Sequence, residues 1–455
     1  METIEFGQKQ PIHIAIRSLI HDYPQDEGIL KELIQNADDG GASSIRFILD
    51  RHRVPAVEGP VPDWGLFSGP SLVVTNSEPF AEDDIKNIQR LSNSGKVRQV
   101  NQTGRYGRGF NAVYNLTDTP LLVTGEYVSL FDPCGFHVGT SKSGAAWKLS
   151  SSEWGKEYPD ALRIFESGGL EQGASIHNGT IFRFPLRTQL RGDTSDDRIT
   201  DQCFLPETFY RLVDGLEKLA DQVVLFLRNI TFIGCYEIPP GGGRPVPLLE
   251  IETINQEEVR LGRQMVADVL GQADSIDGML DVVADLEDEH FESLFQHKLS
   301  IRRPGKHESL TWLVCSGIYA GTDGCLVEIA RALNHAGNKA IPLGGAAICL
   351  ERNDRTLPGT DGKTSCFLPL SGVLGGVKLG FSINGSFDLD GSRTGITKHK
   401  EGEFGTTEDR ARWNVRLVEE AVVHAVASVF SEVAARTEED VLIRPANTFI
   451  FYREA

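Results

Sequence analysis

The stretch ILKELIQNADDGG, residues 29–41, combines an apolar helical stripe with a row of polar side chains beside it. At 100° per residue, its apolar residues fall on one sector of a helix. Glu32, Asn36 and Asp39 share a neighbouring sector at spacings i, i+4 and i+7. Such a row faces solvent on most surface helices, but it can also line a cavity between a helix and a sheet. The segments that follow decide between the two.

Alternating helices and strands follow this stretch. Residues 43–50 and 71–76 are apolar runs of strand length, and residues 81–91 open with acidic side chains, as helices often do. Residues 92–111 are rich in Gly, Asn, Ser and Arg, which predicts a loop, with a short helix from Phe110. Later apolar runs come in antiparallel-looking pairs. We therefore expect an α+β fold, a two-layer sandwich with helices on one face of a mixed, mostly antiparallel sheet.

The second half of the chain is predicted to form a separate unit. Residues 206–229 have the spacing of a long amphipathic helix, and a loop rich in Pro and Gly follows at 239–247. Strands then alternate with a helix in an α/β pattern, and residues 413–437 have the spacing of a terminal helix. The expected parts are a first domain over residues 1–195, a middle α/β domain over 196–400 and a C-terminal helical segment over 401–455.

Composition limits the functions that the chain can have. The 455 residues carry 45 Lys and Arg against 64 Asp and Glu, a net charge of −19, which disfavours broad binding to nucleic-acid backbones. No apolar run is long enough to span a membrane, and the first residues do not read as a signal peptide. The seven cysteines show no metal-ligand spacing. We expect a cytoplasmic protein with neither nucleic acid nor membrane as a partner.

A second motif, TGRYGRGFNAVY at residues 103–114, supplies a candidate phosphate site. Gly104, Gly107 and Gly109 let the backbone approach a ligand closely. No Asp or Glu occurs from residue 91 to residue 117, whereas this segment contains Lys96 and three arginines. In so acidic a chain, this is the local positive charge that phosphate binding needs. The spacing G-x-x-G-x-G matches neither a Rossmann nor a Walker loop.

Taken together, the motifs resemble a known family. The order E-L-I-x-N-x-x-D, S-G-K, G-x-Y-G-x-G-F and then Gly179-Thr180 is similar to that of the GHKL ATPases, with the chaperone branch the closest match. Within this branch, FGQKQPIHIAIRSLIHDYP, FSGPSLVVTN and INGSFDLDGSR resemble one repeat unit of the sacsin type. The resemblance is strongest over the first 190 residues. It implies ATP and Mg²⁺ as cofactors.

The resemblance also assigns roles to individual residues. It implies that Glu32 orients or deprotonates the water that attacks the γ-phosphate, and that Asn36 holds Mg²⁺ against the phosphates. Both roles suit the side chains, because a carboxylate accepts a proton and an amide oxygen is a hard ligand. Asp39 corresponds to a carboxylate that organises water. Around the nucleotide, it implies further contacts from Lys96, Gly104, Gly107, Gly109, Phe110 and Thr180.

Two other positions match the family pattern less clearly. Most GHKL ATPases read the adenine amino group with an aspartate in a D-x-G-x-G turn, whereas this chain has Asn76 there and no glycines. An amide is neutral and can present either an acceptor or donors, so the choice of base is open. The resemblance further implies an arginine from the middle domain that stabilises γ-phosphate charge, and Arg393 is the candidate. An ordinary exposed arginine is an equally good reading of that position.

Two functions remain after this comparison. The first is slow Mg²⁺-dependent ATP hydrolysis that drives lid closure and conformational change in a chaperone-like or regulatory protein. The alternative is a nucleotide-binding or scaffolding module with little or no hydrolysis, which the altered adenine turn favours and Glu32 opposes. A DNA-associated GHKL ATPase fits the acidic charge poorly. The partners implied are ATP or ADP, protein clients or co-chaperones, and a second copy of the chain in a homodimer.

Overall fold

The computed structural model divides the chain into two compact units. The first contains residues 1–93, 107–216 and 234–248, and the second contains 94–106, 217–233 and 249–455. The residues that the structure describes are 11–20, 26–55, 58–89, 109–139, 142–189, 198–286, 288–356, 361–371, 379–390, 395–398 and 406–439.

The first unit combines helices with a sheet. Its helical segments are α1 (Ile12–Ile20), α2 (Gly28–Asp39), η1 (Trp64–Ser68), α3 (Glu82–Ile88), η3 (Gly109–Asn115), α4 (Ser152–Lys156), η4 (Ala161–Gly168) and α5 (Pro206–Glu217). Its strands are β1 (Ser44–Asp50), β2 (Ser71–Asn76), β3 (Leu121–Gly125), β4 (Tyr127–Phe131), β5 (Gly144–Lys148), β6 (His177–Pro185) and most of β7 (Phe232–Ile238). The α+β prediction is thus confirmed, and α2, β1 and β2 form where the apolar patterns place them.

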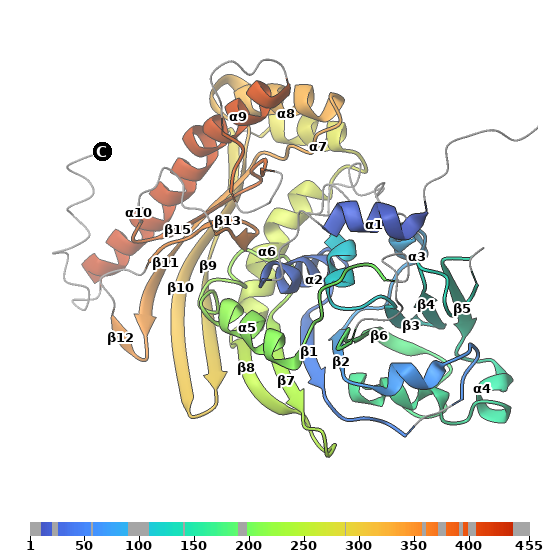
Figure 1. Ribbon diagram of the computed structural model, residues 1–455. Coiled ribbons are helices and arrows are strands. Elements are labelled where there is room, and N and C mark those ends of the chain that lie inside the picture. The colour runs from blue at the N-terminus through green and yellow to red at the C-terminus, as the bar shows by residue number, and fades with distance from the viewer. Residues whose placement is uncertain are drawn as a thin grey trace, which may run out of the picture. The chain divides into compact units, whose positions relative to one another are not determined.

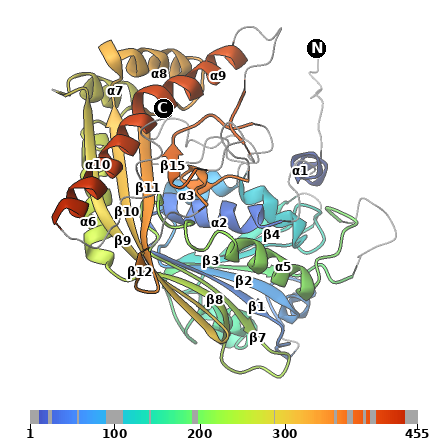
Figure 2. The ribbon, with the colours of Figure 1, turned by 90° about the vertical axis from the view of Figure 1, so that its left-hand side faces the viewer.

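The strands of this unit lie in the order β7-β1-β2-β6-β3-β4-β5. The register of every pair from β1 to β5 is antiparallel. Alternation along the strands therefore gives the sheet two distinct faces. Figure 2 shows α2 and α5 over one face of β1 and β2. On the opposite face, η1 and η4 contribute Trp64, Phe67, Ile164 and Phe165 to a core that also contains Val73 and Ile181 of the strands.

Packing on both faces differs from the predicted sandwich with helices on one face. The predicted helices α2 and α5 do share a face, but the second face is not left to solvent. The segments that cover it are short 3-10 helices, whose few residues carry no helical periodicity that a sequence pattern could reveal.

The predicted helix over residues 206–229 is too long, because α5 ends at Glu217. Turns follow it, with the Ala220 N–H donating to the Glu217 carbonyl and the Gln222 N–H donating to the Leu219 carbonyl. Residues 223–227 are all buried, so this stretch has no polar face to turn toward solvent. A fully buried run looks helical by its apolar content, but it is not an amphipathic helix.

A buried ion pair joins the sheet of the first unit to η1 and η4. Arg183 of β6 is 0 % exposed, and its Nη1 lies 3.1 Å from Oδ2 of Asp50 on β1. The same guanidinium donates to the carbonyls of Phe67, Gly69 and Ile164 at 2.9–3.0 Å. Burial lowers the pKa of Arg183, and the Asp50 carboxylate opposes this shift. One side chain therefore fixes both 3-10 segments to the strands.

We expect Asp50→Ala to destabilise this unit by about 3–5 kcal/mol, because it leaves a buried guanidinium without a counter-charge. The matched control is Glu237→Ala. Glu237 pairs with Arg51, one residue along, at 3.0 Å, but this pair is partly exposed, so we expect a loss of at most about 1 kcal/mol. Urea unfolding followed by tryptophan fluorescence measures both. Equal losses in the two variants would contradict a special role for the buried pair.

The second unit has longer strands and more helix. Its helical segments are α6 (Gln256–Leu270), α7 (Ile276–Ala284), η6 (Thr322–Gly324), α8 (Cys325–His335), α9 (Thr406–Leu417), η8 (Val418–Val422) and α10 (Val423–Glu439). Its strands are β9 (His290–Arg303), β10 (Lys306–Tyr319), β11 (Leu343–Arg352), β12 (Arg355–Thr356), β13 (Thr364–Cys366), β14 (Leu368–Pro369), β15 (Ser382–Gly385) and most of β8 (Val246–Thr253).

The sheet of the second unit runs β8-β9-β10-β11-β15-β13-β14, with β12 paired to β11. Its pairs are antiparallel except for β13 with β15, which is parallel. The core joins residues of α6, α7, α8, α9 and α10 to those of β10 and β11. Gly344 of β11 has no room for a side chain, because Ala421 of η8 would lie 2.9 Å from its Cβ. This close approach sets α10 against β11 (Figure 1).

The C-terminal helix was predicted over residues 413–437 and is longer. It begins at Thr406 and runs through a π-helical turn, η8, to Glu439. No helix among the described residues has the length and apolar character needed to cross a membrane.

Candidate functional site

Helix α2 presents the predicted polar row at its edge. Ile29, Leu30, Leu33, Ile34 and Ala37 are buried, as the apolar stripe predicts. Glu32, Asn36 and Asp39 are each partly buried, between this stripe and the exposed side of the helix. None of the three is fully exposed to solvent. Glu32 and Asp39 both take part in polar or charged interactions.

Asn36 has the chemistry of a cation ligand. Its side-chain amide makes no hydrogen bond within the part of the chain that the structure describes. An amide oxygen without a partner can coordinate a hard cation such as Mg²⁺. Among the described residues, no group of three or more His, Cys, Asp or Glu side chains is placed to hold a metal ion. The Asn36 amide oxygen is of the ligand type that Mg²⁺ accepts beside phosphate and water oxygens.

The sheet brings together Asn76 and Thr180, two residues about a hundred positions apart in sequence. They are direct partners in the antiparallel register of β2 and β6. Gly179 is needed beside them, because a Cβ there would lie 2.7 Å from the Asn76 carbonyl oxygen. Burial lowers the pKa of His177, at the start of β6, so its imidazole is neutral at pH 7.

Thr180 is fully buried and organises the loop after β2. Its hydroxyl donates to the Glu78 carbonyl at 2.7 Å and lies 3.1 Å from the Thr124 hydroxyl on β3. Because the Thr180 hydroxyl proton is donated to the Glu78 carbonyl, the Thr124 hydroxyl is the donor in its bond to the Thr180 oxygen. Thr124 in turn accepts from the Phe80 N–H at 2.7 Å. Thr180 is 0 % exposed, so these two hydroxyls form a buried link between β6, β3 and the loop after β2.

The C-terminal end of α2 reaches the same loop. The Ser77 hydroxyl accepts from the Ser43 N–H at 2.9 Å, and the Ser77 N–H donates to the Ser44 carbonyl at 3.2 Å. A Cβ on Gly41, directly after the helix, would lie 4.0 Å from a side-chain atom of Glu78. The end of α2 that bears Asp39 therefore lies at the same end of the sheet as Asn76.

Phe110 lies on the α2 face of the sheet. Its ring centroid is 5.5 Å from that of Phe182 and 5.6 Å from that of Phe131. Phe182 lies two residues after Thr180 on β6, and so on the same face of the sheet. The short helix predicted from Phe110 is a 3-10 helix of seven residues, η3, which begins at Gly109. So short a 3-10 turn has no sizeable dipole.

Several predicted site residues lie outside the described residues. These are Lys96, Gly104, Gly107 and Arg393. The basic residues expected around phosphate, Arg98, Arg105 and Arg108, lie outside them as well. Their roles stay predictions.

Two contributors escaped the sequence patterns. Asp38 is 1 % exposed and takes part in polar or charged interactions, although its helical position next to Asp39 gives no sign of burial. Thr124 is 2 % exposed and completes the hydroxyl chain with Thr180. A threonine at the end of an apolar strand, such as LLVTG, is a weak signal, because its partner is set by strand order.

Known proteins place these features in a family. A family model described as the Sacsin domain matches residues 9–249. The chain belongs to the sacsin domain family. The match includes α2, β2, η3 and β6, and so every described candidate residue.

A curated relative extends this similarity. Human sacsin is 28% identical over 440 residues, which is 95% of this chain. The same alignment covers 9% of the human protein, so the chain spans a small part of that relative's length. The alignment with human sacsin thus covers parts of both compact units, whereas the Sacsin domain match ends at residue 249.

Proposed function

We propose that this sacsin-domain chain binds ATP with Mg²⁺ on the α2 face of its first unit and hydrolyses it slowly. The conformational change that follows would serve a chaperone-like or regulatory role. The observation that carries the proposal is the Asn36 amide, which has no hydrogen-bond partner among the described residues and lies on the same helix edge as Glu32. The loop that follows Asn76 is hydrogen-bonded both to Ser43, just after this helix, and to Thr180.

Several of the candidate residues have distinct tasks in this proposal. The amide of Asn36 holds Mg²⁺, which neutralises phosphate charge when bound. The carboxylate of Glu32, one turn earlier, orients water and accepts its proton. Thr180 keeps the role that the family resemblance implies, beside the adenine-side water network. Lys96, the glycine loop and Arg393 keep the roles that the family resemblance implies, and Phe110 would pack beside the nucleotide.

The geometry of Asn76 supports the alternative, a nucleotide-binding or scaffolding module that hydrolyses little. The Asn76 Oδ1 accepts from the Glu78 N–H at 3.1 Å, which fixes the amide oxygen toward the loop. The amide NH₂ is then left to face outward, and it donates rather than accepts. An adenine amino group also donates, so this pairing is poor.

We therefore expect Asn76→Asp to raise the affinity for Mg-ATP by about three- to tenfold, since a second carboxylate oxygen can accept from the amino group while the first keeps the Glu78 bond. The affinity for Mg-GTP, which has a carbonyl at that position, should fall or stay constant. Competition titrations with the two nucleotides measure this. Equal changes for both nucleotides would remove Asn76 from base recognition.

Phosphate release distinguishes hydrolysis from binding alone. We expect the purified chain to release phosphate from Mg-ATP slowly, and EDTA to abolish the release. A chain that binds Mg-ATP without releasing phosphate would support the scaffolding alternative instead.

A further inference from the structure

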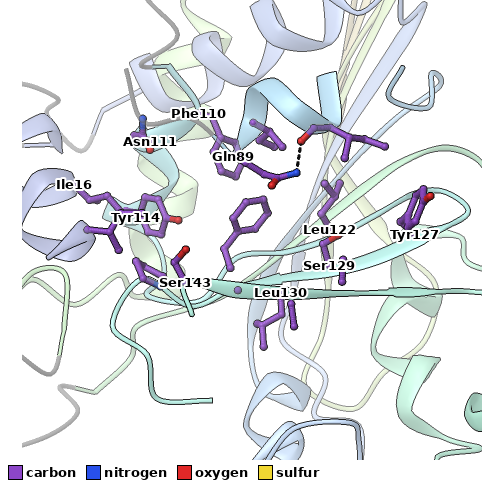
Figure 3. Close-up of a pocket in the computed structure, with 18 of the residues that line it drawn as sticks. Ile16, Gln89, Phe110, Asn111, Tyr114, Leu122, Tyr127, Ser129, Leu130 and Ser143 are labelled. Atoms are coloured by element: carbon purple, nitrogen blue, oxygen red, sulfur yellow. Dashed lines mark hydrogen bonds between the residues drawn. The ribbon is translucent and has the colours of Figure 1, made fainter. Parts of the chain in front are cut away.

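Two histidines of the second unit meet at a surface that includes neither the candidate nucleotide residues nor the cavity lined by Phe110 (Figure 3). His290 is the first residue of β9, and His424 is the second residue of α10. Their ring centroids are 5.9 Å apart. Both residues are exposed, so an ion can reach the pair directly from solvent.

The backbone determines which nitrogen of His290 is available to a ligand. Its Nδ1 lies 2.7 Å from the carbonyl oxygen of Asp288. A carbonyl oxygen only accepts, so Nδ1 carries the proton and Nε2 of the neutral ring keeps its lone pair. Histidines that bind metals usually have this second bond, because it orients the ring and makes the free nitrogen more basic. The ring of His424 makes no hydrogen bond within the described part of the chain.

The spacing of the two rings suits one shared metal ion. Zn–N bonds are about 2.0–2.1 Å long, so two imidazoles on one tetrahedral ion have ring centroids about 5–6 Å apart. The observed separation of 5.9 Å lies within this range. Small rotations of the two exposed rings would therefore direct one lone pair of each at the same ion.

A carboxylate fixes the two elements that carry the histidines. Glu292, on the same face of β9 as His290, accepts from the hydroxyl of buried Tyr319 at 2.8 Å. Its other oxygen accepts from the hydroxyl of Ser428, one helical turn after His424 on α10. The Tyr319 ring centroid lies 6.0 Å from that of His290 and 6.1 Å from that of His424. The backbones of both histidines are thus held in place before any ion binds.

The charge of the neighbouring chain favours a cation. No Lys or Arg occurs between Arg263 and Lys298, whereas this segment contains nine acidic residues. Two of them, Asp288 and Glu289, directly precede His290 and are exposed. Their field attracts divalent cations to this surface. No group of three or more His, Cys, Asp or Glu in the described residues is placed to hold a metal, so water completes the shell of an ion held by two histidines.

We propose that His290 and His424 together bind one divalent transition-metal ion, with Zn²⁺ as the representative of this class. Imidazole nitrogen suits Zn²⁺ and Cu²⁺, whereas Mg²⁺ takes oxygen ligands. The bound ion links the start of β9 to α10. The inference goes beyond the proposed ATPase, since it uses another unit of the chain and another class of metal.

Isothermal titration of the full chain with Zn²⁺, in excess Mg²⁺ and without nucleotide, tests this site. We expect saturable binding at micromolar Zn²⁺. Losing a group that merely orients a metal ligand costs about 10–100-fold, so His290→Gln and His424→Gln should each weaken binding by at least about tenfold. The double variant should bind about as weakly as either single variant, because one remaining histidine cannot chelate.

The matched control is His335→Gln, which removes an exposed histidine of α8 outside the pair and should bind Zn²⁺ like the wild type. Circular dichroism checks the fold of each variant. Zn²⁺ should also raise the melting temperature of the wild type more than that of either single variant of the pair.

Three results would overturn the shared site. The first is a wild-type chain that does not bind micromolar Zn²⁺, and the second is a variant of either histidine that binds like His335→Gln. The third is a loss of one Zn²⁺ per chain in each single variant with the remaining affinity unchanged, which means that the two histidines bind separate ions. None of these results depends on whether the chain binds ATP.

Discussion

Glu32→Ala is expected to bind Mg-ATP nearly as tightly as the wild type while its turnover number falls by about 10²–10⁴-fold. The carboxylate is proposed to act on water rather than on the nucleotide, so its removal affects the chemical step and spares binding. The position of Glu32 favours a loss of turnover without a loss of binding, because Glu32 lies one helical turn before Asn36 on the same partly buried edge.

Two variants make this result specific. Glu32→Gln keeps the size of the side chain and removes its basicity, so we expect the same loss of turnover. Glu171→Ala removes an exposed carboxylate outside the site and should hydrolyse ATP like the wild type. Phosphate release at saturating Mg-ATP measures all three. If Glu32→Ala keeps wild-type turnover, Glu32 is not the base.

Asn36→Ala is expected to weaken Mg-dependent ATP binding by at least about tenfold, or about 1.4 kcal/mol. The Asn36 amide oxygen is the proposed Mg²⁺ ligand, and alanine has no oxygen to replace it. Binding of ATP in EDTA, which does not use the metal, should be the same in the variant and the wild type.

The neighbouring Gln35 provides the control. It has the same amide on the same helix, but it lies outside the row of Glu32, Asn36 and Asp39. Gln35→Ala should therefore bind Mg-ATP normally. A variant of Asn36 that binds as well as the variant of Gln35 would contradict the proposed coordination.

The sequence predicted those parts of the fold that have a strong local period. Helix α2 and strands β1 and β2 carry regular apolar patterns, and they form within one or two residues of the predicted bounds. The prediction failed where burial replaced periodicity. Residues 223–227 are all buried and apolar and do not continue α5, and the second face of the first sheet is covered by short 3-10 segments.

The candidate site also has parts that the sequence predicted and parts that it did not. Spacing alone was enough to place Glu32, Asn36 and Asp39 on one helix edge, since helical geometry fixes it. The pairing of Asn76 with Thr180 depends on the order of β2 and β6 in the sheet, which motif order could suggest only through a family resemblance. The fixed orientation of the Asn76 amide depends on a single backbone N–H of Glu78, and no pattern in the sequence encodes it.

Isothermal titration of the wild-type chain with ATP, with and without Mg²⁺, tests the central claim most directly. The account predicts saturable binding at or below millimolar ATP that weakens when EDTA removes the metal. A folded chain that shows no binding of ATP or ADP up to millimolar concentration would contradict it, and the sacsin domain of this chain would then be a scaffold.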